Sequence, residues 1–139
     1  MSEMHDFNAQ VIAEFRANDG VVGGNFEGAT ILLLTTTGAK SGLERTTPTV
    51  CRVDGDDVYV FASKAGAPTN PDWYHNLVAN PEVGVELGTD SYRARAVVIE
   101  GDQRDQVYAA HAEQYPGFAE YVDLVAGARI IPVVRLDRI

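Results

Sequence analysis

Residues 35–48 read TTTGAKSGLERTTP, a glycine-containing loop that lies between two β-forming segments. An apolar run over residues 31–34 leads into this stretch, and a strand-like segment over residues 49–53 leads out of it. A short turn between two such segments predicts an antiparallel hairpin. The remaining segments are interpreted from this hairpin, because strands joined by short links favour an antiparallel sheet or barrel.

The loop of the hairpin carries groups that suit a bound phosphate or carboxylate. Gly38 and Gly42 would leave backbone N–H groups accessible, and Lys40 and Arg45 add two positive side chains. The loop is not a Walker phosphate-binding loop, because only three residues separate the glycines and no lysine follows Gly42. The alternative is an ordinary turn with glycines at its bends and solvated basic side chains.

Length and composition predict one globular domain. The 139 residues are 45% hydrophobic and 22% charged, and no apolar run approaches the length of a bilayer span. The first ten residues lack the basic and apolar regions of a signal peptide. We therefore expect a cytoplasmic protein without stable membrane insertion, and the single cysteine, Cys51, excludes an internal disulfide.

The distribution of charge is more informative than its total. A net charge of −9 argues against binding to nucleic acid or to an anionic membrane. The chain nevertheless has two lysines, Lys40 and Lys64, and each follows a predicted strand in a glycine-containing loop. Residues 28–43 and 58–71 contain no acidic residue. This pattern predicts a local anion site in an otherwise acidic protein.

Periodicity and turn signals predict six strands and four helices. The strands are expected at residues 29–37, 45–53, 58–63, 82–87, 91–100 and 129–136. The helices are expected at residues 5–18, within 71–81, and at 102–115 and 118–125. Residues 19–28, with four glycines, should be irregular, and Pro132 should place the last strand at an edge or a bulge. Strand runs with segregated helices predict an α+β fold built on an antiparallel barrel.

Side chains typical of metal or nucleophilic chemistry form no recognisable pattern. His5, His75 and His111 are far apart in the chain, so no metal site is expected. Cys51 lies in a predicted strand without a nearby histidine and is interpreted as a small buried residue.

Three motifs in the family's order resemble the deazaflavin-dependent nitroreductase family, the A-type branch of the flavin/deazaflavin oxidoreductases. They are LLLTTTGAKSGLERTTP at 32–48, VYVFASKAGAPTNPDWYHNLVANPEVGVE at 58–86, and QYPGFAEYVDL at 114–124 followed by RIIPVV at 129–134. The resemblance runs from about Asp19 to the C-terminus. Three motifs in register are far more specific than any one of them.

The resemblance implies a split β-barrel and the coenzyme F420, a deazaflavin with a ribityl phosphate and an oligoglutamate tail. It implies one deazaflavin-binding domain over residues 1–139, with an N-terminal helix at 1–18 and the barrel at 19–139. It also implies hydride transfer to a small electron-poor acceptor, which would be a quinone, an enone or a nitroaromatic. The absence of a catalytic triad is compatible with this chemistry, because the cofactor carries it.

The family's binding positions carry over residue by residue. Its anion loop falls on Lys40, Ser41, Gly42, Arg45 and Thr46, and Thr47 and Pro48 join the cofactor-binding candidates. The ring and ribityl chain would lie along Ala62, Ser63, Lys64 and Gly66, with Trp73 and Asn76 lining the cofactor from the inserted helix. Tyr115 and Tyr121 match substrate-pocket tyrosines and are the candidate proton donors, although solvent could donate and both could be wall residues.

Two positions depart from the family pattern. Ala39 stands where many relatives carry a basic residue, so the tail site has one positive charge fewer. Phe118 stands where a nitroimidazole-activating relative has a tyrosine, which argues against that class of substrate.

Three other functions fit parts of the same pattern. The chain could carry F420 without catalysis, could be an FMN-binding split-barrel oxidoreductase, or could bind a hydrophobic ligand without redox chemistry. The expected partners are a small-molecule acceptor and, through pairing of barrel edges, a second copy of the chain in a homodimer. No nucleic-acid partner is expected.

Overall fold

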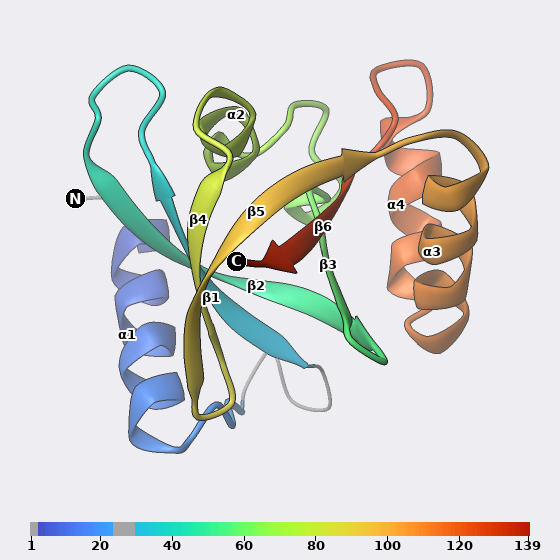
Figure 1. The fold of residues 1–139 in the computed structure, drawn as a ribbon. Coiled ribbons are helices and arrows are strands. Elements are labelled where there is room, and N and C mark those ends of the chain that lie inside the picture. The colour runs from blue at the N-terminus through green and yellow to red at the C-terminus, as the bar shows by residue number, and fades with distance from the viewer. Residues whose placement is uncertain (1–2, 24–29) are drawn as a thin grey trace.

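The computed structural model describes residues 3–23 and 30–139, in which six strands close into an antiparallel barrel (Figure 1). The strands are β1 (Ile31–Thr37), β2 (Glu44–Asp54), β3 (Asp57–Phe61), β4 (Glu82–Leu87), β5 (Asp90–Ile99) and β6 (Val133–Arg138). They follow the order β1-β2-β3-β6-β5-β4 around the barrel, and all neighbouring pairs are antiparallel. The predicted α+β fold with an antiparallel barrel is confirmed.

The β1–β2 hairpin places the loop of residues 38–43 at one end of the barrel. Side chains alternate between the two faces of a strand, so Leu32 and Leu34 fill the interior while Leu33 faces outward. All three are fully buried, because the outward face of β1 is covered by the N-terminal helix. The apolar run before the loop is thus buried on both sides.

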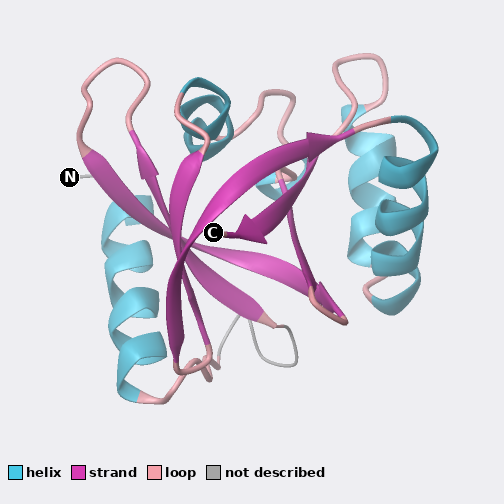
Figure 2. Ribbon diagram, in the orientation of Figure 1, coloured by secondary structure: helices cyan, strands magenta, loops and turns pink. Residues whose placement is uncertain are grey.

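Among the described residues, four α-helices lie outside the barrel (Figure 2). They are α1 (Glu3–Ala17), α2 (Asp72–Ala79), α3 (Gly101–Gln114) and α4 (Gly117–Val125). Helix α1 packs Val11 and Phe15 onto the barrel wall, and α3 and α4 lie on the other side of the barrel (Figure 1). Helix α2 covers one end, where Trp73 and Leu77 join the interior cluster. A 3₁₀ turn, η2 (Lys64–Gly66), precedes α2 and packs against α4.

The last strand differs from its prediction. β6 begins at Val133 rather than Arg129, so Pro132 lies before the strand and forms no bulge within it. β6 pairs with β3 on one side and β5 on the other, so it is not an edge strand. Proline has no N–H to give a strand ladder, but the Pro132 C=O accepts a hydrogen bond from Ala62 N–H at 3.0 Å. The expected edge or bulged strand over 129–136 is therefore wrong.

The other element boundaries agree with prediction to within two residues wherever the structure describes them. The β2–β3 turn falls at the expected DGDD sequence, with Gly55 in the left-handed region at φ 64°. Within the predicted irregular stretch, residues 24–28 lie outside the described residues. None of the helices in the described part of the chain has the length and apolar character needed to cross a bilayer.

Candidate functional site

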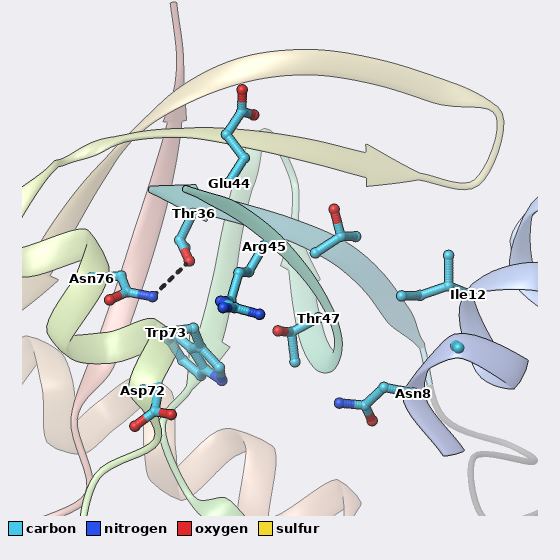
Figure 3. A pocket seen from close by; sticks show the side chains of 11 residues that line it. Asn8, Ile12, Thr36, Glu44, Arg45, Thr47, Asp72, Trp73 and Asn76 are labelled. Atoms are coloured by element: carbon cyan, nitrogen blue, oxygen red, sulfur yellow. Dashed lines mark hydrogen bonds between the residues drawn. The ribbon is translucent and has the colours of Figure 1, made fainter. Parts of the chain in front are cut away.

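A hollow of about 590 Å³ lies where the end of the β1–β2 hairpin, α2 and α1 meet (Figure 3). Five predicted cofactor-binding residues line it: Arg45, Thr46, Thr47, Trp73 and Asn76. Six further residues complete its wall and were not predicted: Asn8, Ala9, Ile12, Thr36, Glu44 and Asp72. A volume of this size lies within the range of small-molecule and cofactor sites.

Arg45 is the positive group of the hollow. Its guanidinium and the Thr47 side chain extend into the space in front of Trp73 (Figure 3). Within the described part of the chain, the Arg45 guanidinium forms no salt bridge. It is therefore available to an anionic ligand, to which arginine can donate two parallel hydrogen bonds.

The wall also contains two acidic residues, which the acid-free stretches around the two lysines did not predict. Glu44 and Asp72 both line the hollow, and each lies just outside an acid-free stretch. Their carboxylates point away from the Arg45 guanidinium (Figure 3). The hollow thus has one positive group inside and two carboxylates at its margin, so an anion is favoured beside Arg45 rather than throughout the hollow.

Asn76 and Asn80 tie α2 to the β1–β2 hairpin. Asn76 Oδ1 accepts a hydrogen bond from Ala39 N–H at 3.0 Å, and Asn76 Nδ2 donates to Thr36 Oγ1 at 3.3 Å. Asn80 Nδ2 donates to the Thr37 C=O at 3.3 Å. The Asn76 amide therefore holds the loop in place at the edge of the hollow, a role that the sequence motif did not reveal.

The hairpin loop has fewer free N–H groups than its glycines suggested. Gly38 N–H donates to the Leu43 C=O at 2.8 Å, and Gly42 N–H donates to the Gly38 C=O at 3.0 Å. Leu43 N–H donates to Ser41 Oγ at 3.2 Å, and Ala39 N–H is bonded to α2. The anion-binding capacity of this region therefore rests mainly on side chains and not on a cradle of backbone N–H groups.

Eight predicted cofactor-binding residues lie outside the wall of the hollow. The exposed ones are Lys40, Ser41, Gly42 and Lys64, the half-buried ones are Ser63 and Gly66, and the buried ones are Pro48 and Ala62. Lys64 Nζ donates to Thr69 Oγ1 at 3.3 Å. Pro48 and Ala62 are buried and do not line the hollow, so they would act by placing their neighbours.

Arg129 holds the loop of residues 62–70 and was missed by the sequence analysis. Its guanidinium donates five hydrogen bonds to this loop, at 2.8–3.0 Å. Burial lowers the pKa of Arg129 from its ordinary value. No local pattern could have revealed the contact, because the loop lies 59–67 residues earlier in the chain.

Tyr121 and Tyr115 do not line the hollow but lie beyond the 62–70 loop, around α3 and α4. Tyr121 packs against Gly66, where an added Cβ would come within 3.2 Å of Tyr121 Cδ1. Tyr115 follows α3, and its hydroxyl accepts a long hydrogen bond of 3.5 Å from Gln114 Nε2. Gln114 Oε1 accepts in turn from Arg52 Nη1 at 3.0 Å.

Comparisons with known proteins identify the family to which this chain belongs. The F420H(2)-dependent quinone reductase family matches residues 8–137. This chain belongs to that family. It is 36% identical over 133 residues to an F420H(2)-dependent quinone reductase of Mycobacterium tuberculosis, which covers 91% of this chain and 86% of that protein.

Two solved structures are also similar to this member of the quinone reductase family. One is an F420-H2 dependent reductase, FDR-A, with a TM-score of 0.69 and 38% identity, covering 77% of this chain and 93% of that chain. The other is described as a domain-swapped dimer, with a TM-score of 0.71 and 32% identity, covering 96% and 98%. Both similarities support the barrel architecture derived above.

In this quinone reductase family member, aromatic rings fill the space between β3 and the α3–α4 pair. The His111 ring stacks on Phe61 with centroids 4.2 Å apart, and the Phe118 ring meets it edge-on at 4.4 Å. His111 is fully buried, and neither of its ring nitrogens has a hydrogen-bond partner in the part of the chain that the structure describes. Burial and the nearby Arg52 charge lower the pKa of His111 to about 4, so the ring is neutral at pH 7.

Cys51 is buried inside the barrel, as predicted. Burial raises the pKa of its thiol to about 12, so the reactive thiolate is not formed at neutral pH. Among the side chains that the structure describes, in residues 8–23, 30–64 and 66–139, no group of three or more His, Cys, Asp or Glu residues is placed to hold a metal ion.

We expect His111 to make this protein less stable in acid. Its pKa is about 4 when folded and ordinarily 6.5, so the unfolded chain binds the proton more readily. The contribution of neutral His111 to the free energy of unfolding is fully present above about pH 6.5 and is lost as the pH falls towards 4. The loss amounts to about 2–3 kcal/mol. Urea unfolding at pH 7 and pH 4.5 measures the free energy of unfolding of this protein and of the His111→Leu variant. The variant has the same carboxylates but lacks the histidine, so the unaltered protein should lose more stability between the two pH values. Equal losses in both proteins would contradict the assignment.

Proposed function

We propose that this chain is a reductase that uses reduced coenzyme F420 to transfer a hydride to a small electron-poor acceptor, with quinones as the acceptor class. The observation that carries the proposal is the hollow beside the β1–β2 hairpin, which combines the Arg45 guanidinium, without a salt bridge among the described side chains, with the aromatic wall of Trp73. Family membership supports the choice of coenzyme and of acceptor. When bound, the reduced deazaflavin supplies the hydride.

The residues of the hollow fit an anionic, aromatic coenzyme. Arg45 would bind the phosphate or the acidic tail, with Lys40 reaching over from the exposed loop. The hydroxyls of Thr46 and Thr47 would donate to the same groups, and Trp73 would form the apolar wall. These side chains bind and orient, which is what a hydride transfer requires of the protein.

Tyr115 and Tyr121 are proposed to form the acceptor side of the site. Both are half-buried beside aromatic rings, and Tyr121 touches the loop that carries Ser63 and Lys64. A reduced quinone must gain a proton, and either phenol could donate it, with solvent as the alternative. Tyr115→Phe and Tyr121→Phe should separate these roles, because a proton donor changes the pH profile of turnover and a wall residue changes mainly KM.

Two measurements on the purified protein test the function. Fluorescence titration with F420 should show saturable binding, and reduced F420 should be oxidised when menadione is added. Binding without turnover would indicate a coenzyme carrier instead of an enzyme. Stronger competition by FMN than by F420 would indicate a flavin-binding oxidoreductase. Absence of binding to F420 would contradict the proposal.

Assembly and location are part of the same proposal. We infer a homodimer in the cytoplasm, and a similar structure described as a domain-swapped dimer supports the dimer. Light scattering coupled to size-exclusion chromatography should give twice the chain mass of 15.0 kDa. A mass of one chain at micromolar concentration would contradict the dimer.

A further inference from the structure

Every N–H group of the Arg129 guanidinium donates to one segment, the loop of residues 62–70. Nη1 donates to the Ala62 C=O and to Asn70 Oδ1, both at 2.8 Å. Nη2 donates to the C=O groups of Ser63 and Ala67 at 2.8 Å, and Nε donates to the Ala67 C=O at 3.0 Å. All five donors of the guanidinium are used by this one loop, so the contact restrains the loop strongly.

Arg129 has no acidic partner among the side chains that the structure describes, in residues 8–23, 30–64 and 66–139, and its charge is balanced there by carbonyl and amide dipoles. Its own backbone N–H donates to the Val125 C=O at 3.1 Å, and Ala128 N–H donates to the same oxygen at 2.9 Å. Val125 is the last residue of α4. Arg129 therefore connects the loop, which its side chain binds, to the end of α4, which its backbone binds.

The loop and α4 also touch at Gly66. This residue lies in the left-handed region at φ 83°, and an added Cβ would come within 2.7 Å of Leu124 Cδ1. The same Cβ would lie 3.2 Å from Tyr121 Cδ1. The loop therefore lies directly against the helix face that carries Tyr121, and a shift of either element would change their spacing.

We propose that Arg129 is a positioning residue that holds the 62–70 loop and α4 together as one unit, which fixes the spacing between the coenzyme side and the acceptor side of the site. This inference rests on the proposed function, because it assigns Ser63 and Lys64 to the coenzyme and Tyr121 to the acceptor. Hydride transfer depends steeply on the distance and angle between the reacting groups, so a shift of about 1 Å can cost roughly 100-fold in rate.

Arg129→Lys is the informative variant, because it keeps the positive charge but cannot reach the five acceptors. Arg104→Lys is the matched control. Arg104 also donates to a backbone carbonyl of the segment after α4, from Nη2 to the Ile131 C=O at 2.8 Å, but none of its hydrogen bonds among the described residues goes to the 62–70 loop. Both variants lose arginine contacts in the same segment, so a difference between them reports on the loop.

The first readout is amide hydrogen exchange of the protein without coenzyme. Gly66 N–H and Ala67 N–H are bonded to the Ser63 C=O and the Lys64 C=O at 2.9 and 3.0 Å. We expect Arg129→Lys to speed exchange of these two amides at least tenfold, and Arg104→Lys to leave them unchanged. The second readout is menadione reduction, in which kcat should fall about 10- to 100-fold in Arg129→Lys with a smaller change in coenzyme affinity.

Faster exchange together with a lower kcat supports the proposal. Unchanged exchange, or faster exchange with an unchanged kcat, would overturn it, since Arg129 would then either not hold the loop or hold it without consequence for the reaction. If the unaltered protein neither binds F420 nor reduces menadione, the proposed function itself fails, and the catalytic role of Arg129 fails with it. The exchange measurement would then still decide whether Arg129 restrains the loop.

Discussion

Removal of Arg45 and Lys40 together is expected to weaken F420 binding by about two to four orders of magnitude. Each charge-assisted hydrogen bond to the phosphate or the acidic tail contributes roughly 1.5–3 kcal/mol, and two of them correspond to a loss of roughly 3–6 kcal/mol. Both residues are exposed and form no salt bridge in the described part of the chain, so the fold should be retained. Fluorescence titration of Arg45→Ala/Lys40→Ala measures the effect.

The matched control is Arg93→Ala/Arg95→Ala. These arginines lie on β5, are exposed and do not line the hollow. Their substitution removes the same number of positive charges from the protein as the Arg45→Ala/Lys40→Ala variant. Only a small loss of affinity is expected in the control, because long-range effects of exposed charges are screened by salt. Equal losses in the two double variants would show that total charge, and not the β1–β2 hairpin, governs binding.

Truncation of Trp73 to alanine should have the largest effect on stability. Trp73 is 8% exposed, belongs to the interior cluster and also forms a wall of the hollow. Loss of such a side chain from a core typically costs about 3–5 kcal/mol of unfolding free energy. Urea unfolding measures this loss, and F420 titration of the folded protein should show affinity reduced at least tenfold.

Leu77→Ala separates the two roles of Trp73. Leu77 lies one helical turn further along α2 and is 1% exposed in the same cluster, but it does not line the hollow. Its truncation should cost a comparable 2–5 kcal/mol of stability and leave F420 affinity nearly unchanged. If both variants bound F420 equally well, Trp73 would be a core residue alone.

The local sequence pattern was sufficient to predict most helices, strands and turns, and part of the candidate site. The Gly38–Gly42 loop, the turn at Gly55 and the alternating strand at residues 82–87 are specified by residues close together in the chain. The two turns form their hydrogen bonds within a few residues, and the strand shows its alternation of apolar and polar residues within six positions, so the sequence reveals them. The resemblance then pointed to Arg45, Trp73 and Asn76, and the structure brings all three to one hollow.

Contacts between segments that are distant in the chain could not be predicted from the local sequence pattern. Asn8 of α1 borders the hollow, and Asn76 holds the hairpin loop from 37 residues away in the sequence. Pro132 gives another example. Proline within a strand indicates an edge or a bulge, but barrel closure pairs the strand that follows Pro132 on both sides.

The hairpin, the strand alternation and the basic loop were therefore specified locally, because their geometry is set by neighbouring residues. The hollow, the acidic residues at its margin and the Arg129 contact depend on barrel closure, which brings α1, α2 and the segment after α4 against the hairpin and the 62–70 loop. Closure is a global property: the β1–β4 and β3–β6 pairings join strands distant in sequence, and no short stretch of residues encodes either pairing alone.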